Sequence, residues 1–148
     1  LFVTQNLASP DRTLGAVVGY HEQTALAGSV PETQKNLVGG LELKDRRIEL
    51  RAEAYDHSRD VSADMTSWYA NSLVWLLPRV GVIYRFDRGD NLKATKTAAD
   101  HGAQAQSVGV VWRPYAEVLL KGEYRLNRFD AASVASYDNW NAFFALKF

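Results

Sequence analysis

The chain has 148 residues, and its 17 Lys and Arg residues are balanced by 17 Asp and Glu residues, so the formal net charge is zero. This length suits a single domain with a core, and the charge balance excludes a strongly basic nucleic-acid binder. The absence of cysteine excludes disulfide scaffolds, thiolate metal sites and cysteine nucleophiles. No run of about 18 apolar residues occurs, so the sequence predicts no transmembrane helix.

Apolar and polar residues alternate with a period of two through most of the sequence, which is typical of β-strands with two different faces. The last segment shows this most clearly, because Trp140 and Phe144 share one parity and Asn141 has the other. The alternation predicts eight strands, over residues 13–24, 36–44, 47–57, 67–77, 80–88, 105–113, 116–128 and 138–148. Residues 1–7 also read as extended and would add a ninth strand.

The expected connections alternate between short and long. Tight turns are expected at residues 44–47, 77–79 and 113–116, and proline in two of them fits a turn because it fixes φ and cannot donate to a sheet. Longer polar stretches are expected as loops, over residues 25–35, 56–66, 88–104 and 130–138. We therefore predict a single all-β domain over residues 1–148, with antiparallel strands in up-and-down order.

Alternation alone does not say which face of the strands meets water. In a soluble sandwich or barrel the apolar face points inward, whereas in a membrane barrel it meets lipid and the polar face lines the lumen. Several expected strands span about 9 to 12 residues, which fits the roughly 9–11 residues of a tilted membrane strand better than the usual 5–6. A soluble β-barrel or sandwich with a solvated charged face stays open as the alternative.

Aromatic residues gather near both ends of the expected strands. The short-turn ends carry Trp112, Tyr115 and Phe148, and the long-loop ends carry Tyr20, Trp68, Tyr69, Phe86, Phe129, Tyr137 and Trp140. Amphipathic rings at two levels are typical of the two interfaces of a membrane.

The asymmetric connections, the alternating strands and the terminal segment 142–148 resemble bacterial outer-membrane β-barrel proteins of porin-like families. In that class, a final strand ending in Phe with apolar or aromatic residues at alternate positions is the signal read by the assembly machinery. The matching residues are Trp140, Phe144, Leu146 and Phe148. The resemblance implies a transmembrane β-barrel in the bacterial cell outer membrane, in contact with lipid, lipopolysaccharide and the barrel assembly machinery.

The resemblance also implies a porin-like channel for passive diffusion of small hydrophilic solutes or ions, with no cofactor. From their shared parity we predict that six charged side chains line the lumen, namely Arg51, Glu53, Arg85, Lys121, Glu123 and Arg125. The alternative is a closed eight-stranded barrel with a structural, adhesive or tethering role, because side chains fill the interior of a barrel of that size. Assembly into a homo-oligomer is left open.

A ninth strand favours part of a larger barrel over a complete small one, since bacterial single-chain barrels normally have an even number of strands. The sequence also begins at Leu1 without an initiating Met or a signal-like segment. We therefore expect the C-terminal portion of a larger porin-like barrel, with a complete eight-stranded barrel as the alternative.

Residues capable of catalysis or metal binding are present, but their spacing favours simpler interpretations. The three histidines, His21, His57 and His101, lack the further ligands that a metal site needs. His57 precedes Ser58 at the start of an expected loop, without the context of a nucleophile elbow. Glu49 and the other strand carboxylates alternate with Arg and Lys, which indicates charge ladders. Loop aspartates could bind a divalent cation but show no EF-hand-like spacing. We therefore predict no enzymatic activity and no metal site.

Four arginines are expected to gather at the short-turn end of the strands, namely Arg46, Arg47, Arg79 and Arg113. Neighbouring glutamates, Glu42, Glu49 and Glu117, favour local ion pairing over an anion-binding ring. If several of these arginines pointed into an open lumen, they would favour anionic solutes.

Overall fold

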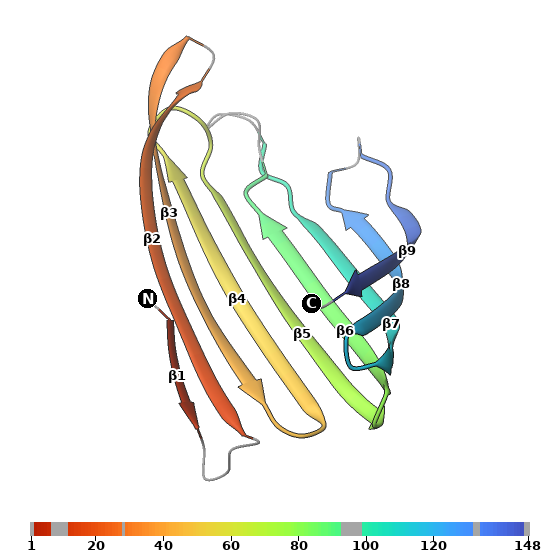
Figure 1. Ribbon diagram of the computed structural model, residues 1–148. Coiled ribbons are helices and arrows are strands. Elements are labelled where there is room, and N and C mark those ends of the chain that lie inside the picture. Colours follow the sequence, from red (N-terminus) through yellow and green to blue (C-terminus); the bar gives the residue numbers. More distant parts are fainter. Residues whose placement is uncertain (1, 7–11, 28, 93–98, 132–133, 147–148) are drawn as a thin grey trace.

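The computed structural model describes residues 2–6, 12–27, 29–92, 99–131 and 134–146, and these residues form one antiparallel sheet without helices. The sheet has nine strands, which pair in the order of the sequence (Figure 1). They are β1 (Phe2–Asn6), β2 (Thr13–Ala27), β3 (Val30–Lys44), β4 (Ile48–Arg59), β5 (Met65–Leu77), β6 (Val80–Asp90), β7 (Ala103–Tyr115), β8 (Val118–Phe129) and β9 (Tyr137–Leu146).

The observed strands confirm the all-β, antiparallel, up-and-down arrangement that the alternation predicts. Each of the eight expected strands corresponds to one of β2 to β9, and the extended segment near the start is β1. The β3–β4, β5–β6 and β7–β8 turns lie at one end of the sheet, and strands β4, β6 and β8 end at the other (Figure 1). We call these the turn end and the loop end.

The predicted loop over residues 25–35 is wrong. Strands β2 and β3 continue their pairing to Ala27 and Val30, so the hairpin rises beyond the rest of the sheet at the loop end (Figure 1). The alternation is lost there because polar residues such as Thr33 and Gln34 occupy both faces. Backbone pairing does not depend on hydrophobic patterning, so the ladder continues where the apolar signal stops.

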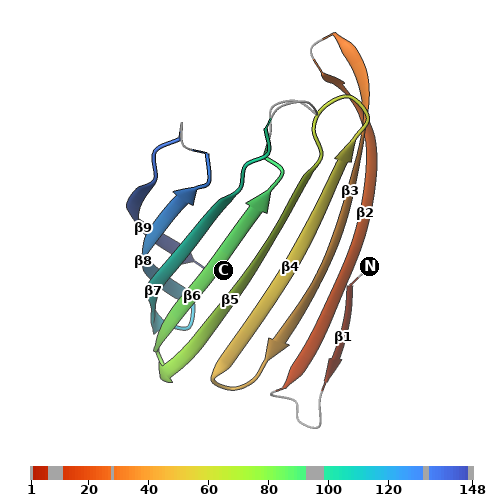
Figure 2. The same cartoon turned by 180° about the vertical axis from the view of Figure 1, so that it is seen from behind.

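The sheet curls along its width. Strands β8 and β9 turn back in front of the neighbouring strands in Figure 1 and lie behind them in Figure 2. The curl gives the sheet a concave and a convex side. The right-handed twist of β-strands favours such curvature.

The sheet is not closed into a barrel within the described residues. Strand β1 pairs only with β2, strand β9 pairs only with β8, and the two edge strands do not meet. The transmembrane barrel therefore stays a prediction. No helix in the described part of the chain is long and apolar enough to cross a membrane.

Candidate functional site

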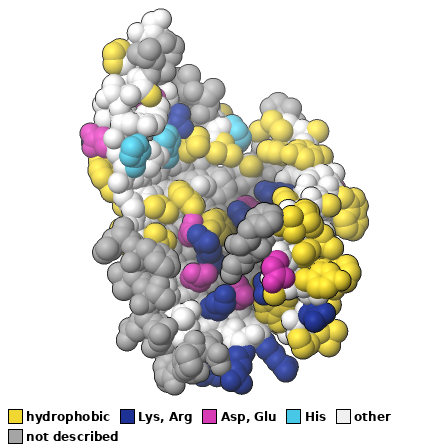
Figure 3. Space-filling model, viewed as in Figure 1, with side chains coloured by type: hydrophobic (Ala, Val, Ile, Leu, Met, Phe, Trp, Pro, Cys, Tyr) yellow, Lys and Arg dark blue, Asp and Glu magenta, His cyan; other side chains and the backbone are white. Residues whose placement is uncertain are grey.

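The two faces of the sheet differ sharply in chemistry. We call the face that carries Arg51, Arg85 and Arg125 the inner face, and the opposite one the outer face. Cross-strand partners place these arginines in one register row, which runs Arg51, Asn71, Arg85, Ser107 and Arg125 across five strands. Figure 3 shows charged side chains of both signs gathered in the hollow of the curled sheet.

Burial is inverted relative to a water-soluble sheet. On the inner face, several polar side chains are buried: Glu53, Ser107, Glu123 and Asn127. On the outer face, large apolar side chains are exposed on seven strands, including Val18, Leu41, Leu50, Leu76, Tyr84, Val110 and Phe144. A soluble antiparallel sheet normally covers its apolar face, so this sheet requires an apolar environment or a covering partner on its outer side.

All six residues predicted to line a lumen lie on the inner face, and the structure joins four of them in two ion pairs along the strands. Arg51 pairs with Glu53 two residues further on, through Nε to Oε1 at 2.6 Å. Lys121 repeats the same arrangement with Glu123, with Nζ 2.6 Å from Oε2. Residues two apart in a strand point to the same side, which explains why the pairs run lengthwise.

Asp87 links two of the predicted residues across strands, although it was not among them. Its carboxylate accepts a hydrogen bond from Arg85 Nη2 at 2.6 Å and lies 3.5 Å from Arg125 Nη2. Asp87 has the same parity as Arg85 in β6, so the sequence could have identified it.

Tyrosines complete the inner cluster. The guanidinium carbon of Arg85 lies 4.3 Å from the ring centre of Tyr69, and Tyr55 stacks on Tyr69 with ring centres 6.5 Å apart. Tyr69 was expected at a membrane interface, but it is the register partner of Glu53 and Asp87 and so faces inward. This expectation is wrong because position near a strand end does not reveal the face.

Two further aromatic residues of the loop end also face inward, where a membrane-interface position had been expected. Phe129 and Tyr137 have the parity of the inner face, and their rings stack with centres 6.1 Å apart. Trp68 and Phe86 have the parity of the outer face and contact each other there, with ring centres 5.0 Å apart. The predicted aromatic level at the loop end is therefore split between the two faces.

A hollow of 470 Å³ lies over the inner cluster, lined among others by Tyr55, Tyr69, Arg85, Asp87, Arg125 and Asn127. Cations, carboxylates and phenol hydroxyls all border it. This surface suits polar solutes and offers no nucleophile with an adjacent base.

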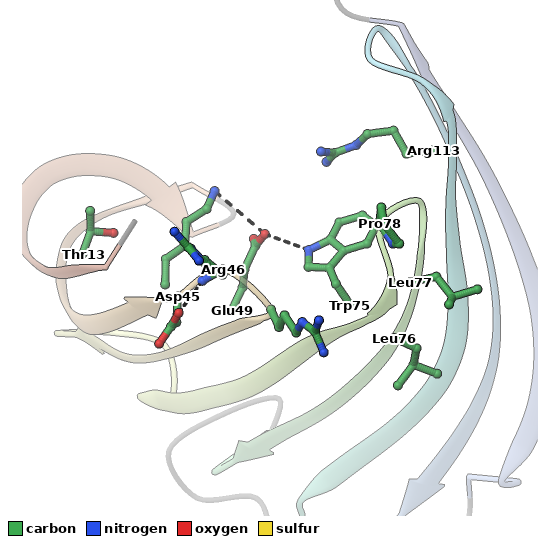
Figure 4. Close-up of a pocket in the computed structure, with 11 residues that line it drawn as sticks. Thr13, Asp45, Arg46, Glu49, Trp75, Leu76, Leu77, Pro78 and Arg113 are labelled. Atoms are coloured by element: carbon green, nitrogen blue, oxygen red, sulfur yellow. Dashed lines mark hydrogen bonds and ion pairs between the residues drawn. The ribbon is translucent and has the colours of Figure 1, made fainter. Parts of the chain in front are cut away.

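A larger hollow of 710 Å³ lies at the turn end of the inner face (Figure 4). Glu49 stands between Lys44 Nζ, 3.8 Å away, and the indole nitrogen of Trp75, which donates to it at 3.3 Å. The guanidinium carbon of Arg113 lies 4.8 Å from the ring centre of Trp75. Arg46 and Arg47 also line this hollow.

Two of the four arginines expected at the turn end make contacts other than the expected pairing with glutamate. Arg113 lies over the indole of Trp75, and Arg79 donates from Nη1 to the carbonyl oxygen of Pro114 at 3.0 Å. Neither contact neutralises the guanidinium charge, so the turn end keeps cationic character.

Three of the four residues of the predicted assembly signal share the outer face of the last strand. Trp140, Phe144 and Leu146 have one parity in β9 and are all exposed. Trp140 also contacts Tyr124 on β8, with ring centres 4.9 Å apart. Phe148 lies outside the described residues.

Two of the three histidines have polar contacts with neighbouring side chains. His57 Nδ1 pairs with the side-chain oxygen of Asn36 on the neighbouring strand, and His21 Nε2 lies 3.2 Å from the side-chain oxygen of Gln23. Within the described part of the chain, no three His, Asp or Glu side chains are placed to hold a metal ion.

Comparisons of this sequence with protein-family models and curated proteins, and of the structure with solved structures, find no match.

Proposed function

We propose that the nine strands form part of the wall of a bacterial outer-membrane β-barrel, and that this barrel is a porin-like channel for passive diffusion of small hydrophilic solutes. The observation that carries the proposal is the inversion of burial, with exposed apolar residues outside and buried ionic residues inside. Lipid is the environment in which such an outer face is stable.

Strand length supports a membrane setting. Strands β2 to β9 have between 10 and 15 residues, whereas soluble strands commonly have about 5–6 and a tilted membrane strand needs about 9–11. Outer-membrane lipid, lipopolysaccharide and the assembly machinery are the partners that this setting implies.

A wide, water-filled lumen is favoured over a packed interior. Within the described residues β1 and β9 do not pair with each other, and we propose that the barrel built on this sheet contains further strands, as the C-terminal portion of a larger barrel would. Barrels of 16 or more strands leave an aqueous channel, whereas side chains fill a barrel of eight.

The test is planar-bilayer recording of the full-length protein after its insertion into lipid vesicles has been verified by flotation. We expect stepwise increases in conductance in potassium chloride, each step marking one inserted channel. If the inserted protein gave no steps, the channel would be excluded, and the closed barrel with a structural or adhesive role would be favoured.

A further inference from the structure

The ion pairs of the inner face share an asymmetry that the balanced charge count hides. In each pair the cationic side chain is more exposed than its carboxylate: 51% against 7% for Arg51 and Glu53, and 22% against 6% for Lys121 and Glu123. Asp87 is 23% exposed beneath Arg85 at 37% and Arg125 at 33%. The carboxylates thus lie close to the sheet, and the cations cover them.

The backbone explains how the glutamates lie so low. Glu53 is the register partner of Gly40, and Glu123 is the register partner of Gly109. A Cβ atom on Gly40 would lie 2.5 Å from Glu53 Cγ, and one on Gly109 would lie 2.8 Å from Glu123 Cβ. Each glutamate therefore occupies space that only a neighbouring glycine leaves open.

The covering cations lie along one line across the sheet. Arg51, Arg85 and Arg125 share one register row, and the hollow of 470 Å³ is bordered by the last two. Toward the turn end the same asymmetry continues, since the side chain of Lys44 is 56% exposed and that of its partner Glu49 is 32% exposed. Arg113 adds a further guanidinium, which lies over Trp75.

The loop end does not share this asymmetry throughout, because Arg128 is 45% exposed against 36% for Asp138, whereas both pairs of Arg88 are reversed. Arg88 is the less exposed member of both of its pairs, at 27% against 42% for Asp90 and 49% for Asp130. Cations more exposed than their carboxylates are therefore the consistent arrangement in the ion pairs of the inner face, whereas the pairs of the loop end are mixed.

We propose that the solutes of this channel are small anions, and that Arg51, Arg85 and Arg125 form the row along which they pass. The inference rests on the proposed channel function and names its solute class. A passing ion meets the exposed guanidiniums at a shorter distance than the carboxylates beneath them, and Coulomb energy falls with distance and with screening by water. Exposed Arg and Lys side chains therefore favour anions, although the whole chain carries equal numbers of cationic and anionic side chains.

The test is the reversal potential of the full-length protein in planar bilayers under a gradient of potassium chloride. We expect chloride to be more permeant than potassium, with a permeability ratio PCl/PK above one. The preference should be larger near 0.01 M than near 1 M salt, because the screening length falls from about 30 Å to about 3 Å.

Arginine variants test whether the row of Arg51, Arg85 and Arg125 causes the preference for chloride. The triple variant Arg51→Gln, Arg85→Gln and Arg125→Gln is expected to lower PCl/PK to one or below. The matched control is Arg128→Gln, which removes one loop-end guanidinium paired with Asp138 at 2.7 Å and should leave PCl/PK unchanged. The circular dichroism spectrum checks that each variant keeps its β-sheet.

The outcomes separate the two proposals. A channel that conducts but prefers potassium would overturn the anion inference and leave the channel function standing. The wild-type protein alone gives this result, so it does not depend on whether a variant folds. Equal loss of anion preference in the triple variant and in Arg128→Gln would also overturn the assignment to the row. A protein that inserts without conducting would overturn both.

Discussion

Two carboxylates tie the long β2–β3 hairpin to its neighbour at the loop end. The side chain of Glu32 is buried and accepts hydrogen bonds from the backbone N–H of Ser62 and from Gln34 Nε2, the latter at 2.9 Å. Asp60 reinforces the junction, because its carboxylate accepts from the backbone N–H of Thr33 at 2.8 Å. The hairpin tip, which extends beyond the rest of the sheet, is thereby fixed to the β4–β5 connection.

The hydrogen bonds from Ser62 and Gln34 hold the pKa of Glu32 at about 2, below its ordinary value of 4.5. Because the folded-state pKa is lowered, the stabilisation is complete above pH 4.5 and is lost as the pH falls toward 2. We expect Glu32→Gln to lower the melting temperature at pH 7, with a difference from wild type that shrinks toward pH 2. Thermal unfolding followed by circular dichroism measures this.

The control for Glu32 is Glu22→Gln, which changes an exposed carboxylate on the same hairpin. This variant should melt close to wild type at pH 7. A Glu32→Gln protein with an unchanged melting temperature at pH 7 would show that the buried hydrogen bonds do not hold the hairpin.

At the scale of the strand, glycine positions decide how the inner face is built. Gly109 in β7 faces inward beside Glu123, and a Cβ atom there would also meet the carbonyl oxygen of Gly122 closer than real atoms approach. Gly122 itself, in the next strand, has open space where its Cβ would be. Two glycines on neighbouring strands thus have opposite roles.

We expect Gly109→Ala to destabilise the protein by about 1–3 kcal/mol, because the added methyl group is blocked by backbone that cannot move aside cheaply. Gly122→Ala is the matched control and should be neutral, since nothing opposes the added atom. Denaturant unfolding of both variants measures the difference in free energy. Equal effects of the two substitutions would contradict the packing of Glu123 against Gly109.

The strands and their faces could be predicted from the sequence because they depend on local alternation, as at Trp140 and Asn141. The shared face of Arg51 and Glu53 followed from the same parity. The contact of Arg85 with Tyr69 could not be predicted, since it depends on the register between strands. The burial of Glu53 could not be predicted either, because the glycine that makes room for it lies on another strand and is identified only by the register between strands.

For the whole molecule, the zero net charge is an average over three different surfaces. The outer face is apolar, the inner face and turn end expose cations over buried carboxylates, and at the loop end Asp90 and Asp130 are more exposed than Arg88, their shared partner. A soluble domain of the same composition would gain nothing from such a separation. The proposed membrane setting uses all three surfaces, because lipid, lumen and loop-end solvent each meet one of them.

Two valines with nearly the same exposure distinguish lipid from water as the medium around the outer face. Val110 lies within the apolar surface of β7 and is 53% exposed, and Val30 lies at the tip of the β2–β3 hairpin and is 52% exposed. In a membrane, Val110→Arg places a charge in hydrocarbon and should cost about 2–4 kcal/mol, whereas Val30→Arg stays in water. In a soluble protein both substitutions should remain within about 0.5 kcal/mol of wild type. Denaturant unfolding from lipid vesicles measures both variants, and equal small effects would place the outer face in water and remove the basis of the proposed channel.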